Sequence, residues 1–149
     1  MGRIMSILKR LAKEFKIETA GAASPESEIQ EMLAKSPIRV PDEYIEILRE
    51  KSEIEISING DDMFRLWNAA GCIELNDAYN IQKYLPHSWA IGDDEGGYAI
   101  VYAEEKGVVG VYAVSFGDLD NNEKIYIAPS LFDFLVKCQG ISIYLALYT

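Results

Sequence analysis

Apolar and polar residues alternate through the middle of the chain, and this pattern predicts paired strands. Isoleucines occupy every second position over 54–58, and Asn59-Gly60 follows at once. Both turn residues tolerate a positive φ, so residues 63–67 are predicted to return as the second strand of a hairpin. Further strands are predicted at residues 89–91, 98–103, 108–116 and 124–128.

Helix signals flank this block of strands. Ser24-Pro25-Glu26 and Val40-Pro41-Asp42 each place a proline where a first helical turn can begin. Shorter helices are expected over 76–85 and over 129–139. Hairpin-linked strands with helices on both sides indicate an α+β fold: a single domain with a largely antiparallel sheet.

The two ends of the chain have patterns of their own. Apolar residues recur at helical spacing between Ile4 and Phe15, with lysines and arginines mostly off that stripe. The stripe predicts a basic amphipathic helix and a linker over residues 1–23, ahead of a domain over 24–149. Such a helix can pack on its own acidic domain, on a partner or on a membrane surface. Alternation over 141–148 favours an edge strand, which would offer a seam for a homodimer.

Charge narrows the classes of partner. The 149 residues carry a net charge of −10, which disfavours binding to the polyanions DNA and RNA. A basic protein partner is favoured, although acidity can also serve solubility alone. No apolar run is long enough to span a membrane or to form the core of a signal peptide, so we expect no membrane association and a cytoplasmic location.

The usual parts of an enzyme are missing from the sequence. His87 is the single histidine, and the two cysteines, Cys72 and Cys138, lie far apart without a Cys-x-x-Cys pair. The glycines at 92, 96 and 97 fit neither nucleotide-binding spacing. We therefore predict no catalytic residues, no metal site and no cofactor.

Two acidic segments remain as candidate chemistry, Asp93-Asp94-Glu95 and the run from Asp118 to Glu123. Crowded carboxylates repel one another unless a cation or a basic side chain neutralises them. The second segment begins like a calcium-binding loop, but Glu123 stands where that loop needs glycine. Each segment can equally be a solvated turn. The residues predicted to bind a partner are Asp93, Asp94, Glu95, Tyr98, Asp118, Asp120 and Glu123.

Two motifs follow one another along the chain, Val40-Pro41-Asp42-Glu43-Tyr44 and Trp89-Ala90-Ile91-Gly92-Asp93-Asp94-Glu95-Gly96-Gly97, and a third runs from Ile127 to Leu135. They resemble motifs of the SUKH superfamily: the first is similar to a helix start of that superfamily, and the second to its central hairpin. The run from Ile127 to Leu135 resembles its closing helix, although Leu131 stands where the family more often has phenylalanine. The order and spacing of the three motifs agree over residues 24–140.

The resemblance implies an α+β domain without known catalysis. Bacterial members of the superfamily are mostly immunity proteins that bind and neutralise toxins, often nucleases, delivered between competing cells. The resemblance therefore implies an immunity protein that neutralises a toxin, and the net charge of −10 fits a basic toxin domain such as a nuclease. The alternative is an intracellular scaffold or regulatory binding domain with a protein partner that is not a toxin, as in the fungal members.

Overall fold

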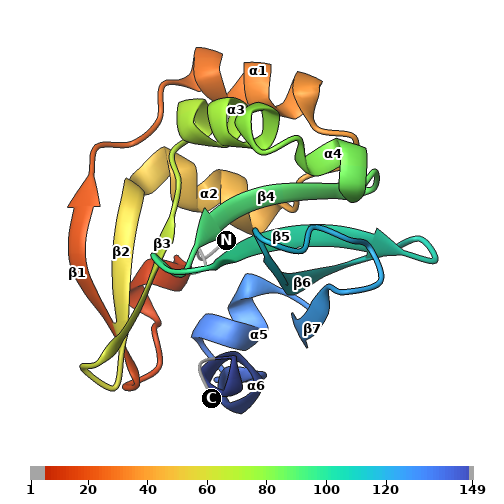
Figure 1. Ribbon diagram of the computed structural model, residues 1–149. Coiled ribbons are helices and arrows are strands. Elements are labelled where there is room, and N and C mark those ends of the chain that lie inside the picture. Colours follow the sequence, from red (N-terminus) through yellow and green to blue (C-terminus); the bar gives the residue numbers. More distant parts are fainter. Residues whose placement is uncertain (1–5, 148–149) are drawn as a thin grey trace.

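The computed structural model describes residues 6–147, and these form one seven-stranded sheet with helices on both sides (Figure 1). The strands pair in chain order and every neighbouring pair is antiparallel, which confirms the predicted α+β class. The strands are β1 (Phe15–Gly21), β2 (Ser52–Ile58), β3 (Asp62–Leu66), β4 (Ser88–Asp93), β5 (Tyr98–Glu105), β6 (Val108–Ser115) and β7 (Ile125–Ala128).

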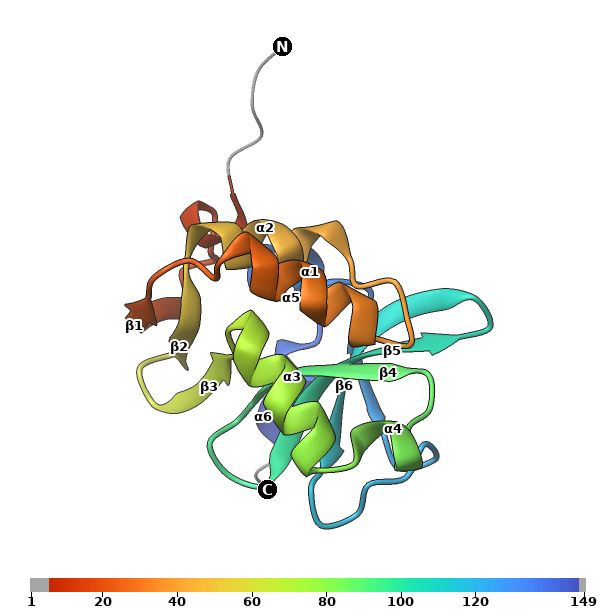
Figure 2. The same cartoon turned by 90° about the horizontal axis from the view of Figure 1, so that it is seen from above.

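The helices gather in two groups around the sheet. In Figure 1, α1, α3 and α4 lie above β4, and α5 and α6 lie below it. Seen from above, α3 lies beside α1 and β4 (Figure 2). The helices are η1 (Ile7–Lys9, a 3₁₀ turn), α1 (Glu26–Lys35), α2 (Asp42–Glu50), α3 (Ala69–Ala78), α4 (Ile81–Tyr84), α5 (Leu131–Leu135) and α6 (Ile141–Ala146). No helix within residues 6–147 is long and apolar enough to cross a membrane.

The sheet changes direction between β3 and β4, which share only two register pairs, Arg65 with Asp93 and Leu66 with Gly92. In Figure 1 the strands β1 to β3 stand upright and the later strands run across them. Gly92 permits the close approach, because a Cβ there would lie 2.2 Å from the carbonyl oxygen of Arg65. The glycine of the central motif is therefore required by the crossing of two backbones.

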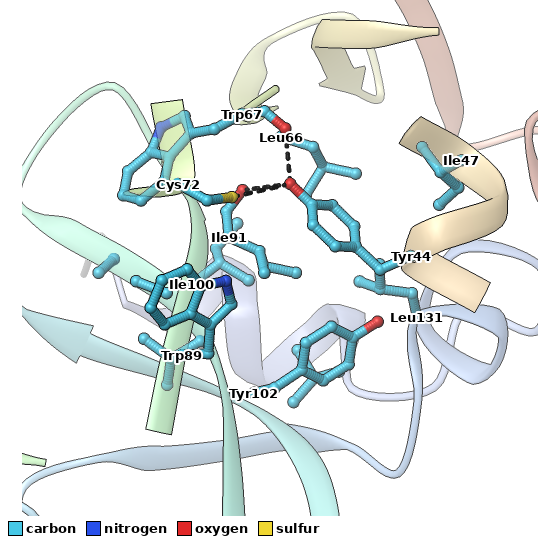
Figure 3. Packing of buried hydrophobic residues seen from close by; sticks show 14 of the residues in the cluster. Tyr44, Ile47, Leu66, Trp67, Cys72, Trp89, Ile91, Ile100, Tyr102 and Leu131 are labelled. Atoms are coloured by element: carbon cyan, nitrogen blue, oxygen red, sulfur yellow. Dashed lines mark hydrogen bonds between the residues drawn. The ribbon is translucent and has the colours of Figure 1, made fainter. Parts of the chain in front are cut away.

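A buried polar contact ties α2 to the middle of the fold. The hydroxyl of Tyr44 donates to the carbonyl of Trp67 at 2.5 Å and lies 3.2 Å from the sulfur of Cys72 (Figure 3). Burial raises the pKa of the Cys72 thiol to about 12, so this cysteine stays protonated and behaves as a small apolar side chain. Tyr44 therefore packs as an anchor of the core and is not exposed for chemistry.

The N-terminal prediction was wrong where the structure tests it; residues 1–5 lie outside the described part. Residues 7–9 form a single 3₁₀ turn, and Phe15–Gly21 is strand β1 where a helix end and a linker were expected. β1 pairs with β2, Phe15 facing Ile58. Tertiary pairing therefore overrides the helical spacing of the apolar residues in this segment.

The C-terminal prediction was also wrong. Ile141–Ala146 forms helix α6, with the Tyr144 side chain buried, where an edge strand was expected. Gly140 begins this helix at φ 83°, a left-handed conformation that suits glycine. Up to residue 147, where the described part ends, this segment therefore forms no edge strand of the kind on which a homodimer was predicted.

Most of the remaining elements lie close to their predicted positions, but residues 69–75 of α3 were not predicted as helix. The β2–β3 turn has positive φ at both Asn59 and Gly60, as the hairpin required. The helix predicted over 76–85 is divided into the end of α3 and α4 by Asn80, at φ 54°. The closing helix, predicted over 129–139, is shorter and spans Leu131–Leu135.

Candidate partner-binding surface

A polar row crosses four strands near the β4–β5 turn. Thr19 on β1 faces Glu55 on β2, Glu55 faces Arg65 on β3, and Arg65 faces Asp93 on β4. Directly opposed residues on neighbouring strands interact, so opposite charges along such a row stabilise the pairing. This row joins the acidic turn found in the sequence to three strands, β1 to β3, that sequence analysis did not connect with it.

Asp93 is a structural residue of this row. Its side chain is buried, and its Oδ2 accepts hydrogen bonds from Arg65 Nε and Trp67 Nε1, both at 2.9 Å. Its Oδ1 accepts from the backbone N–H of Glu95 at 2.8 Å. The bond from Arg65 to Asp93 is the main reason that the pKa of the guanidinium is raised. The carboxylate of Asp93 is thus occupied by hydrogen bonds within the protein.

Asp94 is buried as well and holds the turn closed. Its Oδ1 accepts from the backbone N–H groups of Gly96 at 2.8 Å and Tyr98 at 2.9 Å. This is the local turn chemistry that favours aspartate at such positions. Its Oδ2 is buried and has no hydrogen-bond partner among the described residues. Asp93 and Asp94, which were predicted to bind a partner, therefore present no exposed carboxylate.

Glu95 is the exposed carboxylate of this turn, at φ 60°. Partial burial and contact with the carboxyl group of Glu55 raise its pKa. The pKa of Glu55 is lowered, first by the hydroxyl of Thr19, which donates to Glu55 Oε1 at 2.9 Å, and then by Glu95. Two carboxylates on neighbouring segments thus repel each other near neutral pH, and a cation placed between them would relieve that repulsion.

A groove of about 630 Å³ lies between α3 and the strands β1 to β3. We call it the α3 groove; it is lined by Thr19, Ala20, Gly21, Glu53, Glu55, Arg65, Leu66, Trp67, Asn68, Gly71, Glu74 and Leu75. Asn68, Gly71 and Leu75 follow one another at helical spacing, so one face of α3 forms a wall. Three glutamates line the groove against one arginine, which is already paired with Asp93. The groove is therefore acidic.

A smaller hollow of about 330 Å³ adjoins this groove at Arg65, which lines both. We call it the aromatic pocket; it is lined by Arg65, Tyr79, Asp93, Glu95, Gly96 and Phe116. The rings of Tyr79 and Phe116 lie 4.3 Å apart between centroids, at 33° to each other. They bring the C-terminal end of α3 against the segment that follows β6.

The second acidic segment extends away from the first. It begins beside the β4–β5 turn, where the N–H of Phe116 donates to the carbonyl of Gly97 at 2.8 Å. It ends at Lys124, whose ammonium bonds to Glu105 at the other end of β5. An eight-residue strand spans about 23 Å. The structure therefore does not bring the predicted carboxylates together at one site.

The residues predicted in this second segment are exposed. Asp118, Asp120 and Glu123 all face solvent, and Asp120 Oδ1 accepts from the backbone N–H of Asn122 in a local turn. Tyr98, beside the first turn, is partly buried. Within residues 6–147 no three histidine, cysteine, aspartate or glutamate side chains are grouped so that they could hold a metal ion.

Sequence reasoning missed Glu55, Arg65, Tyr79 and Phe116 as members of this surface. Glu55 and Arg65 occupy polar positions of alternating strands, and that pattern does mark them as facing away from the buried isoleucines. Their pairing depends on the hairpin register, which local patterns did not define. The meeting of Tyr79 with Phe116 joins segments 37 positions apart and left no local signal.

Comparison with known proteins supports the family resemblance. No curated protein matches the chain. Residues 24–137 match the SMI1 / KNR4 family (SUKH-1), a span that runs from just before α1 to just after α5. Proteins of this family are generally immunity or regulatory proteins without enzymatic activity that bind protein partners. The chain therefore belongs to the SMI1 / KNR4 family (SUKH-1).

Proposed function

We propose that this protein is an immunity protein that binds a cognate toxin domain of basic surface, such as a nuclease, and neutralises it by direct contact. Family membership supports a protein partner, because the family includes toxin-immunity proteins. The single observation that carries the choice of a basic partner is the acidic α3 groove, where three glutamates face one already paired arginine.

The chemistry of a nuclease explains why such a groove would bind it. A nuclease attracts the phosphates of its substrate with lysine and arginine side chains. An acidic groove competes for the same side chains and, with a net charge of −10, accelerates the encounter. Contact with the basic cleft would exclude the nucleic acid without any chemical step by the immunity protein.

The proposed contact surface differs in part from the predicted residues. Glu53, Glu55 and Glu74 of the α3 groove join Glu95 as its carboxylates. Asp93 and Asp94 act in it only by holding the turn in place. Tyr98, Asp118, Asp120 and Glu123 line neither the groove nor the aromatic pocket, and they remain predicted contact residues outside both.

The direct test is coexpression with the toxin domain encoded beside this gene, scored by growth of the host and by copurification of the two chains. We expect growth to be restored and a stable complex to be isolated. A complex with a regulatory protein, together with no protection against the neighbouring toxin, would favour the scaffold alternative and contradict the proposal.

Two matched triple variants separate the groove from the second acidic segment. Glu53→Gln, Glu55→Gln and Glu74→Gln remove three charges from the α3 groove. Asp118→Asn, Asp120→Asn and Glu123→Gln remove three charges elsewhere. Association rates measured from about 0.05 to 0.5 M salt should fall, and lose much of their salt dependence, mainly in the groove variant. Equal effects of both variants would mean that net charge alone, and not the groove, attracts the partner.

A further inference from the structure

We propose that the aromatic pocket receives one arginine side chain of the protein partner, its guanidinium stacked on the Tyr79–Phe116 pair and bonded to Glu95. This inference rests on the proposed function for the existence of a basic partner. It adds the identity of the anchoring side chain and the place where that side chain binds.

The shape of the pocket suits a flat cation. Its volume of about 330 Å³ accommodates a single long side chain, and it lies at the surface beside the β4–β5 turn. Tyr79 is 43% exposed although its ring already packs on Phe116. A half-exposed aromatic pair in a hollow is the kind of rigid platform on which interface anchors stack.

The charges around the pocket are unbalanced in favour of a cation. Asp93 is saturated by Arg65, Trp67 and the backbone of Glu95. Glu95 therefore remains as the exposed carboxylate of the lining, and its contact with Glu55 adds a second negative charge. Against these three carboxylates stands one cation, Arg65.

A further oxygen lies behind the wall of the pocket. Asp94 is 6% exposed, and its Oδ2 accepts no hydrogen bond from the described residues. It lies 3.6 Å from the place that a Cβ of Gly96 would occupy, and Gly96 lines the pocket. A buried carboxylate oxygen without a donor adds to the negative potential felt at this wall.

Arginine fits this combination better than lysine does. Its planar guanidinium can stack on an aromatic face and present N–H groups to a carboxylate in the same plane. The ammonium of lysine is compact and strongly hydrated and gains less from a ring face. A side chain without positive charge would leave the Glu55–Glu95 repulsion in place.

The test uses small probes, so it does not depend on knowing the partner. Backbone amide shifts of the ¹⁵N-labelled full chain are followed during titration with N-acetyl-arginine amide, N-acetyl-lysine amide or N-acetyl-citrulline amide. We expect saturable shifts at Glu95, Gly96 and Phe116 with the arginine probe, at millimolar concentrations. The lysine probe should bind roughly three- to fivefold more weakly, because its hydrated ammonium gains less from the ring face than a stacked guanidinium does. The uncharged citrulline probe should cause no saturable shift.

Variants locate the binding. Tyr79→Ala and Glu95→Gln should each weaken the arginine probe by about threefold or more. Tyr126→Ala, which removes a similarly exposed tyrosine on β7, and Glu31→Gln, on the exposed side of α1, serve as controls that should leave binding unchanged. Linear, unsaturable shifts, or shifts elsewhere with the pocket amides unmoved, would overturn the inference. Toxin protection is measured separately. A protein that neutralises its toxin but does not bind the arginine probe would contradict the arginine pocket and leave the proposed function standing.

Discussion

Arg65 Nε and Asp93 Oδ2 lie 2.9 Å apart across the short junction between β3 and β4. The two residues are register partners, and the junction holds only one further pair. The ion pair therefore supplements a short backbone ladder, which the hydrogen bond from the Trp67 N–H to the Ile91 carbonyl extends by one further contact. Because Arg65 also lines the α3 groove and the aromatic pocket, the same contact positions the proposed binding surface.

We predict that Asp93→Asn destabilises the protein by about 2 kcal/mol. The amide cannot accept from Arg65, Trp67 Nε1 and the Glu95 N–H together, so at least one buried donor loses its partner. The loss stays below that of a fully buried pair because the Arg65 side chain is 48% exposed and partly screened. Urea unfolding of both proteins measures the difference.

Asp118→Asn is the matched control for this change. It removes the same charge from the exposed second acidic segment, so the free energy of unfolding should change by less than about 0.5 kcal/mol. If the two variants were equally stable, Asp93 would not hold the junction, and its burial would have no energetic consequence.

We predict that Gly92→Ala is among the most disruptive small substitutions in this chain. The added Cβ would meet the Arg65 carbonyl oxygen at 2.2 Å, so β3 and β4 must move apart. Overpacking of this kind costs about 3 kcal/mol. Gly97→Ala, in the same turn but with nothing within 4 Å of the new Cβ, should cost less than about 1 kcal/mol. Thermal unfolding of the two variants gives the comparison, and similar melting temperatures would contradict the steric argument.

The elements that could be predicted from the sequence are those with local signals. The β2–β3 hairpin follows from alternating isoleucines and Asn59-Gly60, and the helices after Pro25 and Pro41 follow from their first turns. The pairing register of the β2–β3 hairpin could not be predicted from these local signals. Asp61 also lies in the loop, so Ile58 faces Asp62 and Glu55 faces Arg65. A loop shorter by one residue would have turned Arg65 to the opposite face.

Both ends of the chain show why short apolar patterns are ambiguous. Phe15 and Ile17 fit a strand as well as a helix, and only the pairing with β2 decides between them. Ile141, Tyr144 and Leu145 equally fit one helix face, and the structure places them on α6.

The candidate binding site could not be predicted from the sequence for a different reason. Sequence shows that aspartates occupy a turn, but not whether their carboxylates face solvent or cap the turn from inside.

Glu43 is predicted to stabilise α5 from a distance in sequence. Its Oε2 accepts from the Tyr102 hydroxyl and from the N–H of Leu131, both at 2.7 Å, and its Oε1 accepts from the N–H of Phe132 at 3.0 Å. Glu43→Gln places an NH₂ group against one of these donors, which should cost about 2 kcal/mol. Glu46→Gln, on the exposed side of the same helix, is the control and should cost less than about 0.5 kcal/mol. Equal costs in urea unfolding would contradict the capping role.

The Glu55–Glu95 contact predicts a pH dependence of stability that Glu95→Gln removes. Partial burial and Glu55 raise the pKa of Glu95 in the folded chain. The folded state therefore binds this proton more tightly than the unfolded state does. The associated stability is complete below the ordinary glutamate pKa of about 4.3 and is lost as the pH rises through the folded pKa.

The glutamine variant lacks this titration. The melting temperature of the variant minus that of the native protein should therefore rise between about pH 4 and pH 7. Added salt should reduce this difference, because it screens the repulsion between the carboxylates of Glu55 and Glu95. Melting temperatures of the two proteins at pH 4, 5, 6 and 7 measure the effect. A difference that stays constant, or that shrinks as the pH rises, would show that Glu55 and Glu95 do not repel each other in the folded protein. The aromatic pocket would then lack the excess negative charge on which arginine binding depends.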